Sequence, residues 1–306
     1  MAVPIAAAIR SKYPDAEIHW AVEPYCSPVI DTERLVNDIV LFPRDEWEKN
    51  RWSPRTWRDQ LGTYTRMRGR KFDIGIDLQG QAKTALCLRF AKPKKRIAVK
   101  SHDFISAKLN PVLEVSRGQM HTIEHSMMAL QRLEEFPKEI RFLMPELPAE
   151  QESIRGKIDR QRPLATISVS AGGKKKIYAL DHWGTVAEGL LNNGFQVAFL
   201  GGKNDPCPPV EHAMNWVGEL SLREAMAAVK LSAVHLAADT GTGHFAAAYN
   251  VPVVSVFGRT KPYWYRPYTT NGVVLDGKGS TENITPEQVI EAVGSLTRSK
   301  SGAFSS

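Results

Sequence analysis

Residues 239–244 combine the groups that proteins use to bind an anion. They read Asp-Thr-Gly-Thr-Gly-His and stand between an apolar run and a stretch of small residues. A helix that begins here presents unpaired backbone N–H groups and the positive end of its dipole to a ligand. Glycine lets a ligand approach the backbone closely, and threonine can cap the helix or bond phosphate oxygens. We therefore predict an anion site formed by Asp239, Thr240, Gly241 and His244.

A simpler structure would use the same residues. An aspartate before a turn of small residues is a common helix cap, so Asp239 has a purely structural alternative role. His244 is equally compatible with a buried structural histidine. The sequence leaves both interpretations of this turn open.

A second glycine-containing loop follows another apolar run, within SVSAGGKKKIYALDHW at 168–183. Gly172 permits close backbone approach, and Lys176 closes a run of three lysines that can serve a diphosphate as point charges. The loop lacks the spacing of a nucleotide-binding P-loop. A basic loop without a ligand is the alternative.

The third stretch is LGGKNDP at 200–206, at the end of the next predicted strand. Asp205 is placed to accept hydrogen bonds from ribose hydroxyls, as acids do in nucleotide-binding folds. An Asn-Asp-Pro turn is the alternative, and this stretch alone favours the turn.

In the first half of the chain, DLQGQAKTA at 77–85 brings polar side chains to a strand end and a helix start. Asp77, Gln79 and Lys83 are candidates to face a ligand there, with a helix cap as the alternative role of Asp77. An Asp-x-Asp pair that could hold a metal on a diphosphate is absent from the sequence. We predict no metal and no cofactor.

The elements that must position these residues alternate between strand and helix patterns. Apolar runs typical of strands fall at 16–22, 38–43, 72–78, 95–99, 164–171, 195–202, 233–239, 251–258 and 272–277. Helical stretches of 10–15 residues between strands indicate βαβ units and parallel sheets, whose ligands bind at the carboxyl ends of the strands. The helix predicted at 53–68 carries Trp57, Leu61 and Tyr64 on one face.

Two such blocks predict an α/β protein with two Rossmann-like domains that face a central cleft. The polar, proline-bounded segment 147–163 marks the boundary, so the domains are expected at 1–155 and 156–306. The final helix is a candidate to pack back on the first domain. The first block opens directly in a helix, without the central strand that normally starts a doubly wound domain.

The composition limits which partners, which cellular location and which cysteine chemistry are expected. A formal charge of +7, with basic runs at 66–71 and 92–100, favours anionic partners, although such runs are often only solvated faces. Without an RNA-binding or helix-turn-helix motif, nucleic acid is the weaker choice of partner. The chain shows no apolar stretch near 18 residues and no signal-peptide pattern, and its cysteines (Cys26, Cys87, Cys207) form no C-x-x-C pair. We expect a cytoplasmic protein with free thiols.

Five collinear stretches resemble glycosyltransferase family 9, the bacterial heptosyltransferases, from residue 1 to about residue 295. The most specific is DTGTGHFAAAYNVPVVSVFGRTKPYWYRPY at 239–268, which is similar to the family's Asp-Thr/Ser-Gly pattern with its later Gly-x-Thr-x-Pro. The others are DLQGQAKTA, GELSLREAMAAVKLSAVHLAAD, KIYALDHW and HTIEHS, which start at residues 77, 218, 176 and 121.

The resemblance implies a GT-B fold, with the acceptor on the N-terminal domain and the nucleotide-sugar on the C-terminal one. It implies metal-independent, inverting transfer of heptose from ADP-heptose to the lipopolysaccharide inner core, at the anionic inner face of the cytoplasmic membrane. Lys176 would contact the donor phosphates and Leu220 the adenine. The turn at 239–244 would surround the diphosphate and sugar, and His121 would lie on the acceptor side.

The chain departs from the family pattern in two places. The family begins with a strand and a loop that ends in Gly-Asp, and this Asp is usually assigned as the general base. In this sequence that position would precede Met1, so we expect that the start is set too late. A non-catalytic relative that binds a nucleotide or an anionic glycolipid is the alternative. Tyr178 and Ala179 also replace the usual Trp-Pro, a milder departure.

Overall fold

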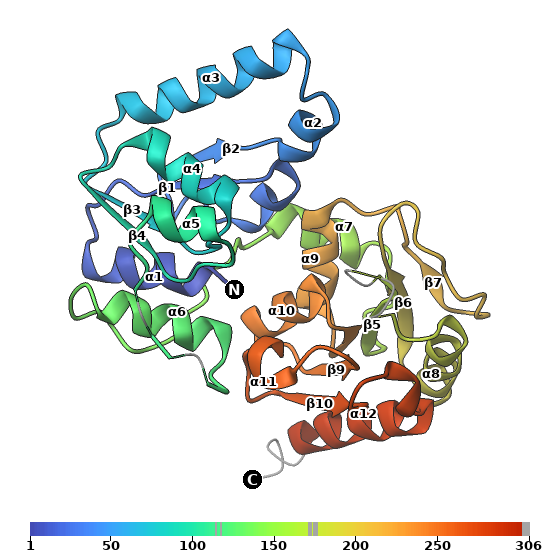
Figure 1. The fold of residues 1–306 in the computed structure, drawn as a ribbon. Coiled ribbons are helices and arrows are strands. Elements are labelled where there is room, and N and C mark those ends of the chain that lie inside the picture. The colour runs from blue at the N-terminus through green and yellow to red at the C-terminus, as the bar shows by residue number, and fades with distance from the viewer. Residues whose placement is uncertain (114, 117, 171–172, 174–176, 302–306) are drawn as a thin grey trace. The chain divides into compact units, whose positions relative to one another are not determined.

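The computed structural model describes residues 1–113, 115–116, 118–170, 173 and 177–301. By its internal contacts the chain divides into two compact units, Met1–Leu143 and Met144–Ser306. The division falls before helix α7 (Pro148–Arg155), which therefore belongs to the second unit. The boundary predicted from the sequence, after residue 155, instead places this helix in the first domain. Figure 1 shows the elements of both units.

Among the residues described in the first unit, four short parallel strands alternate with crossover helices. Its elements are α1 (Val3–Lys12), β1 (His19–Val22), η1 (Pro24–Val29), β2 (Asp38–Leu41), α2 (Arg44–Lys49), α3 (Pro54–Gly69), β3 (Ile74–Asp77), α4 (Ala82–Ala91), β4 (Lys95–Ala98), α5 (Phe104–Leu109) and α6 (Thr122–Gln131). β1 pairs with β2 and β3 pairs with β4, as two separate two-stranded sheets among the described residues. All four strands were predicted from the sequence.

Helix α3 turns a different face inward from the one that its apolar residues suggest. Its buried side chains are Thr56, Thr63 and Met67. Trp57 and Leu61 are exposed by 61% and 68%, so the predicted apolar stripe lies on the outer flank of the helix. The helix itself is confirmed, but its hydrophobic stripe is not its core face.

The described part of the second unit is built on a six-stranded parallel sheet. Its strands are β5 (Leu164–Ser168), β6 (Gln196–Leu200), β7 (Met214–Asn215), β8 (Val234–Ala238), β9 (Val253–Phe257) and β10 (Gly272–Asp276). The helical elements besides α7 are α8 (Leu180–Asn192), α9 (Leu222–Leu231), α10 (Gly241–Ala248), α11 (Pro262–Tyr265), η3 (Thr281–Asn283) and α12 (Pro286–Ser301). Every residue of β5, β6, β8 and β9 is buried, as expected for parallel strands covered by helices on both faces.

The strand order β10-β9-β8-β5-β6-β7 is the dinucleotide-fold order, in which the chain winds outward in both directions from the central strand β5. The order reverses between β5 and β8, which pair with Ser168 opposite Ala237. Ligands of such sheets bind outside the carboxyl ends of the strands at this switch point. The predicted α/β class with parallel sheets is confirmed.

The core of the second unit surrounds Trp183 of α8, which is fully buried. Helix α12 packs against α8 and β10 of the same unit. Gly189 of α8 allows this close approach, because a Cβ at that position would lie 2.5 Å from Cδ1 of Ile290. The final helix therefore has its packing partners in the second unit.

A polar network is buried inside the same sheet. His235 of β8 is fully buried, and its Nδ1 lies 2.9 Å from the hydroxyl of Thr166 on β5. The Thr166 hydroxyl lies 2.8 Å from that of Ser232, which donates to the carbonyl of Ala228. Burial lowers the pKa of His235 to about 3, so the imidazole is neutral in the folded protein.

Candidate functional site

The turn after β8 places the N-terminus of α10 at the carboxyl edge of the sheet. Thr240 is the N-cap residue, and α10 begins at Gly241. Among the described residues, the Thr240 side chain makes no hydrogen bond to the backbone of the first helical turn. Its hydroxyl instead lies 2.9 Å from the hydroxyl of Thr242. The first-turn N–H groups are therefore not capped by Thr240 and can serve an anion.

The two glycines of this turn have different roles. Within the described part of the chain, no heavy atom lies within 4 Å of the point where Gly241 would carry a Cβ. At Gly243, a Cβ would lie 3.2 Å from Cγ of Pro267. Gly241 therefore leaves room for a ligand at the helix terminus, whereas a side chain at Gly243 would press tightly against Pro267. The sequence alone predicts that both glycines let a ligand approach the backbone.

The turn follows β8, the strand that pairs with β5, and the second glycine-containing loop of the sequence follows β5. The predicted donor residues Gly172 and Lys176 belong to this loop and lie outside the described residues. Asp239 and Thr240 are half-buried, as is His244 in the first turn of α10. The structure thus brings all four residues of the predicted anion site to the switch point.

The end of the β5 loop is attached to the core. The hydroxyl of Tyr178 donates to the carbonyl of Ile284 at 3.0 Å, and the hydroxyl of Thr281 donates to the carbonyl of Ile177 at 2.7 Å. The Tyr178 ring meets the Trp183 ring edge-on at 4.8 Å, and burial raises the pKa of Tyr178 to about 12. Tyr178 is thus a core residue in the position where the resembled family usually has tryptophan.

Asp205 connects the loops after β5 and β6. Its carboxylate accepts hydrogen bonds from the Ser170 hydroxyl and from the N–H of Gly202. Nearby, a Cβ on Gly201 would lie 3.0 Å from Val169 and 3.2 Å from Val217. Three successive loops therefore pack together at this edge, with Asp205 half-buried among them. These contacts give Asp205 a loop-stabilising role, and its ribose contact stays a prediction.

Leu220 lies on the same side of the sheet, after β7. Gly218 is held with φ +75° against Lys203, and its N–H donates to the carbonyl of Gly201 at 3.0 Å. Leu220 is half-buried and immediately precedes Ser221, which caps α9. The position suits an apolar contact with a ligand at the carboxyl edge.

In the first unit, Asp77 is occupied by the loop that follows it. One carboxylate oxygen accepts from the N–H groups of Gln79 and Gly80, both at 2.9 Å, and the other accepts from the Thr84 hydroxyl at 2.9 Å. The side chain of Asp77 is buried, whereas Gln79 is exposed. These contacts support a structural role for Asp77, in the turn between β3 and α4. They place Asp77 below the surface that Gln79 and Lys83 present.

His121 is also part of a helix start. Its Nδ1 accepts from the N–H of Ile123 at 3.2 Å, and its own N–H donates to Glu124 at 3.2 Å, which together form a capping box on α6. The residue is buried. His121 therefore caps α6, and its contact with the acceptor remains a prediction.

Lys83 lies beside a carboxylate that the sequence interpretation missed. Its Nζ is 3.8 Å from Oε1 of Glu23, and Nη1 of Arg44 is 3.6 Å from the same oxygen. Glu23 directly follows β1 and is half-buried, so an acid stands at a strand end between two cations. The acid immediately after the predicted strand 16–22 could have revealed it.

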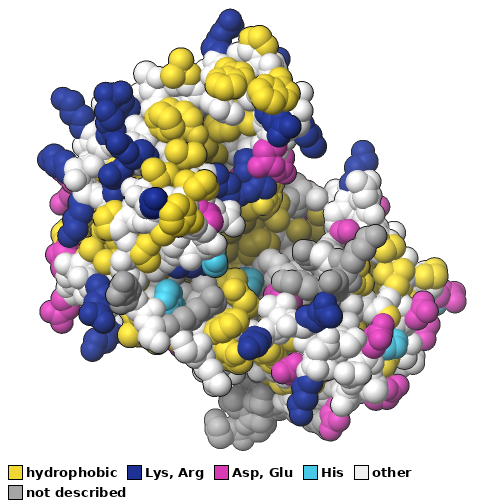
Figure 2. Space-filling model, in the orientation of Figure 1, with side chains coloured by type: hydrophobic (Ala, Val, Ile, Leu, Met, Phe, Trp, Pro, Cys, Tyr) yellow, Lys and Arg dark blue, Asp and Glu magenta, His cyan; other side chains and the backbone are white. Residues whose placement is uncertain are grey.

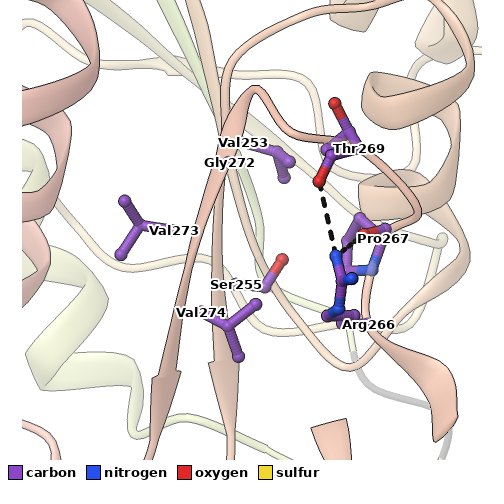
Figure 3. Close-up of a pocket in the computed structure, with 8 residues that line it drawn as sticks. All are labelled: Val253, Ser255, Arg266, Pro267, Thr269, Gly272, Val273 and Val274. Carbon is purple, nitrogen blue, oxygen red and sulfur yellow. Dashed lines mark hydrogen bonds between the residues drawn. The ribbon is translucent and has the colours of Figure 1, made fainter. Parts of the chain in front are cut away.

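Other sites are less suited to chemistry. Among the described residues, no cluster of three or more His, Cys, Asp or Glu side chains could hold a metal ion. A small pocket in the second unit begins at Val253 and Gly272, the first residues of β9 and β10, so it lies away from the carboxyl edge (Figure 3). Arg266 in its wall donates to the carbonyl of Thr269 at 3.3 Å. None of the described helices is long and apolar enough to cross a membrane.

Two heptosyltransferases are similar to this chain along most of their length. The chain is 23% identical over 330 residues to lipooligosaccharide heptosyltransferase 2 of Haemophilus influenzae, covering 94% of this chain and 92% of the relative. It is 24% identical over 275 residues to lipopolysaccharide heptosyltransferase 1 of Pseudomonas aeruginosa, covering 86% of this chain and 76% of the relative.

Solved structures confirm the fold. A family 9 glycosyl transferase of Veillonella parvula matches with a TM-score of 0.84 at 17% identity, over 97% of this chain and 93% of its own. Heptosyltransferase II of E. coli matches with a TM-score of 0.77 at 20% identity, over 98% and 95%. The fold is therefore of the predicted GT-B type. The model of glycosyltransferase family 9 (heptosyltransferase) matches residues 63–292, so the chain belongs to this family.

Proposed function

We propose that this chain transfers a heptose from ADP-heptose to the inner core of lipopolysaccharide, with inversion and without a metal ion. Membership of the heptosyltransferase family supports the reaction class. The E. coli heptosyltransferase WaaC, a structural relative with a TM-score of 0.77 at 16% identity, has been solved with ADP. We propose the nucleotide-sugar and the core acceptor as the partners, in preference to nucleic acid.

The observation that carries the proposal is the N-terminus of α10 at the switch point between β5 and β8. Departure of ADP leaves negative charge on its diphosphate. Fixed N–H dipoles stabilise such charge as it develops, because they need no reorganisation during the reaction. Gly241 leaves room for the diphosphate, and the hydroxyls of Thr240 and Thr242 can donate to its oxygens. Lys176, by resemblance, adds a positive charge.

The remaining donor contacts are proposed along the same edge of the second unit. Leu220 would cover the adenine, and Asp205 would accept from the ribose through lone pairs not used by Ser170 and Gly202. Asp239 and His244 would border the diphosphate and sugar.

On the first unit, we assign the acceptor contact chiefly to Lys83. Its partly exposed ammonium is only 3.8 Å from Glu23, and it can exchange this partner for a carboxylate or phosphate of the acceptor. Arg44, on the same glutamate, offers a second cation. Gln79 is exposed nearby in sequence and can add a hydrogen bond. Such an acceptor lies at an anionic membrane, so we propose a cytoplasmic, peripheral location.

Calorimetric titration with ADP, UDP and GDP, first without metal and then with magnesium, tests the donor site. Saturable binding that prefers ADP and does not need magnesium is expected. Transfer from ADP-heptose to core acceptor, followed by mass spectrometry, then tests the reaction. A folded sample that binds none of the three nucleotides would refute the proposal.

A second candidate is a relative that binds the nucleotide or an anionic glycolipid and transfers nothing. Its support lies in two acids of the first unit. Asp77 accepts three hydrogen bonds, and Asp103 accepts from the N–H groups of Ser106 at 2.7 Å and Ala82 at 2.8 Å. Both carboxylates thus stabilise loops, which opposes a role as general base. Tight ADP binding without any transfer would favour this candidate.

A further inference from the structure

Helix α3 presents large apolar side chains to solvent. Trp57 and Leu61 are exposed by 61% and 68%, and Trp52, just before the helix, by 79%. Trp57 and Leu61 are four positions apart, so they lie on the same side of the helix. Exposed apolar residues that gather in one area, rather than scattering singly, mark an interaction surface.

The apolar area continues from α3 onto α4 and α5. The ring of Tyr64 on α3 stacks on that of Phe90 on α4, with centroids 4.5 Å apart. Leu86 shares the exposed side of α4 with Phe90, and α4 packs against α5, which exposes Phe104 and Ile105. We define the α3–α5 face as Trp57, Leu61, Leu86, Phe90, Phe104 and Ile105. Figure 2 shows hydrophobic side chains over these helices, bordered by Lys and Arg.

Positive charge surrounds this face. Residues 49–71 contain eight Lys and Arg and one Asp, a net charge of +7 that equals the formal charge of the whole chain. Arg55 and Arg58 are exposed on α3 itself. The charges of the rest of the chain therefore sum to zero, although they include the second basic run at 92–100, and the most basic long segment is the one that carries the exposed tryptophans.

Cations also lie directly against the exposed aromatic rings. The guanidinium of Arg51 is 5.3 Å from the centre of the Trp52 ring, and Nζ of Lys108 is 4.2 Å from the centre of the Phe104 ring. Each cation keeps its charge in water while its ring offers apolar surface. Aromatic and aliphatic groups with Lys and Arg at their border suit the boundary between lipid acyl chains and headgroups.

We propose that the α3–α5 face binds the surface of an anionic lipid bilayer, with Trp57 and Leu61 among the acyl chains and the arginines against the headgroups. Charge complementarity selects this occupant. A second copy of the chain would bring the same +7 segment against itself, which repulsion opposes. A nucleic acid would use the cations but would leave the aliphatic Leu61, Leu86 and Ile105 in contact with phosphate and water.

This inference deepens the proposed function, because it names the surface that would hold the enzyme near a lipid-borne acceptor. It rests on the proposed function only for what the membrane contact would achieve, not for whether the contact forms. Binding to vesicles needs neither ADP nor an acceptor sugar, so its failure can be told apart from failure of the transferase proposal. ADP titration of the same samples makes the distinction.

The test is co-sedimentation of the full chain with vesicles of phosphatidylcholine alone and of phosphatidylcholine with phosphatidylglycerol. One variant carries W57S and L61S, and a second carries R55Q and R58Q. All four side chains are exposed, so folding should be unaffected. M128S, on the exposed side of α6, is the apolar control, and K138Q with K157Q is the charge control.

Wild type should bind vesicles that contain phosphatidylglycerol and should be released by high salt. Each α3 variant should weaken the partition coefficient by about tenfold, through lost apolar burial or lost attraction to the headgroups. The controls should bind as wild type does. Absence of wild-type sedimentation, equal loss in the controls, nuclease-sensitive sedimentation, or dimerisation abolished by W57S and L61S would each overturn the proposal.

Discussion

The hydroxyl of Tyr178 donates a hydrogen bond to the carbonyl oxygen of Ile284 inside the second unit, at 3.0 Å. Through this bond the residues that end the β5 loop are fixed to the segment that precedes α12. Y178F removes the donor and leaves the buried carbonyl without it, so we expect the free energy of unfolding to fall by about 1–3 kcal/mol. Urea denaturation measures the loss. An unchanged unfolding midpoint would show that water replaces the hydroxyl.

Two glycine substitutions in α10 should separate binding from packing. G241A places a methyl group over the helix terminus, where the described residues leave room, and should weaken ADP binding by about tenfold without loss of stability. G243A places its methyl group 3.2 Å from Cγ of Pro267, so it should be less stable than G241A, by about 1 kcal/mol. Calorimetry and urea denaturation of both variants check this. Equal ADP affinity in wild type and G241A would contradict the anion site.

The buried His235 should make stability depend on pH. Its pKa is about 3 in the folded protein and near 6.5 in the unfolded chain, so between these values only the unfolded chain binds the proton. The free energy of unfolding should therefore fall as the pH drops through this window, by up to about 1.4 kcal/mol per pH unit. H235N should be less stable at neutral pH but should show a shallower dependence. Parallel slopes for the two proteins would argue against this origin.

Replacement of Asp77 tests whether its role is structural. D77A removes the acceptor of three hydrogen bonds at the start of α4 and should cost about 2 kcal/mol or more of stability. ADP affinity should not change, because Asp77 belongs to the first unit. Thermal denaturation with calorimetry measures both quantities. A stable D77A variant with a raised acceptor KM would instead support direct acceptor contact.

Lys83 should contribute to binding of the acceptor but not to binding of ADP. K83Q removes the cation beside Glu23 and should raise the KM for the acceptor by about tenfold, with the Kd for ADP unchanged. Steady-state kinetics at saturating donor, combined with calorimetry, distinguishes the two effects. K94Q, at an exposed ion pair with Asp73, is the matched control and should behave as wild type. Loss of ADP affinity in K83Q would contradict the assignment.

The sequence predicted the second unit well because its strands are fully buried. Such strands are nearly continuous apolar runs, as in FQVAFL before Gly201 and VVSVF before Gly258, and their loops begin where the apolar run stops. The turn at 239–244 could be located for the same reason. The different needs of Gly241 and Gly243 could not, because they depend on Pro267, a residue distant in sequence.

Helix α3 shows where periodicity misleads. Its apolar residues Trp57 and Leu61 face outward, while the threonines at positions 56 and 63 are buried. Spacing identifies which residues share a face, but not which face packs inward. A similar ambiguity applies to Asp77, since an acid at a strand end can cap a helix or meet a ligand with the same local sequence.

The parallel sheet of the second unit also has a consequence for refolding. Its central pair, β5 and β8, joins residues far apart in the chain, such as Thr166 and His235, which are 69 positions apart. Closing so long a loop costs chain entropy before any contact repays it, and folding rates fall as contacts become less local. The switch point that would hold the donor therefore depends on the slowest kind of strand pairing in the unit. A nucleotide added during refolding should stabilise this pairing only after it has formed.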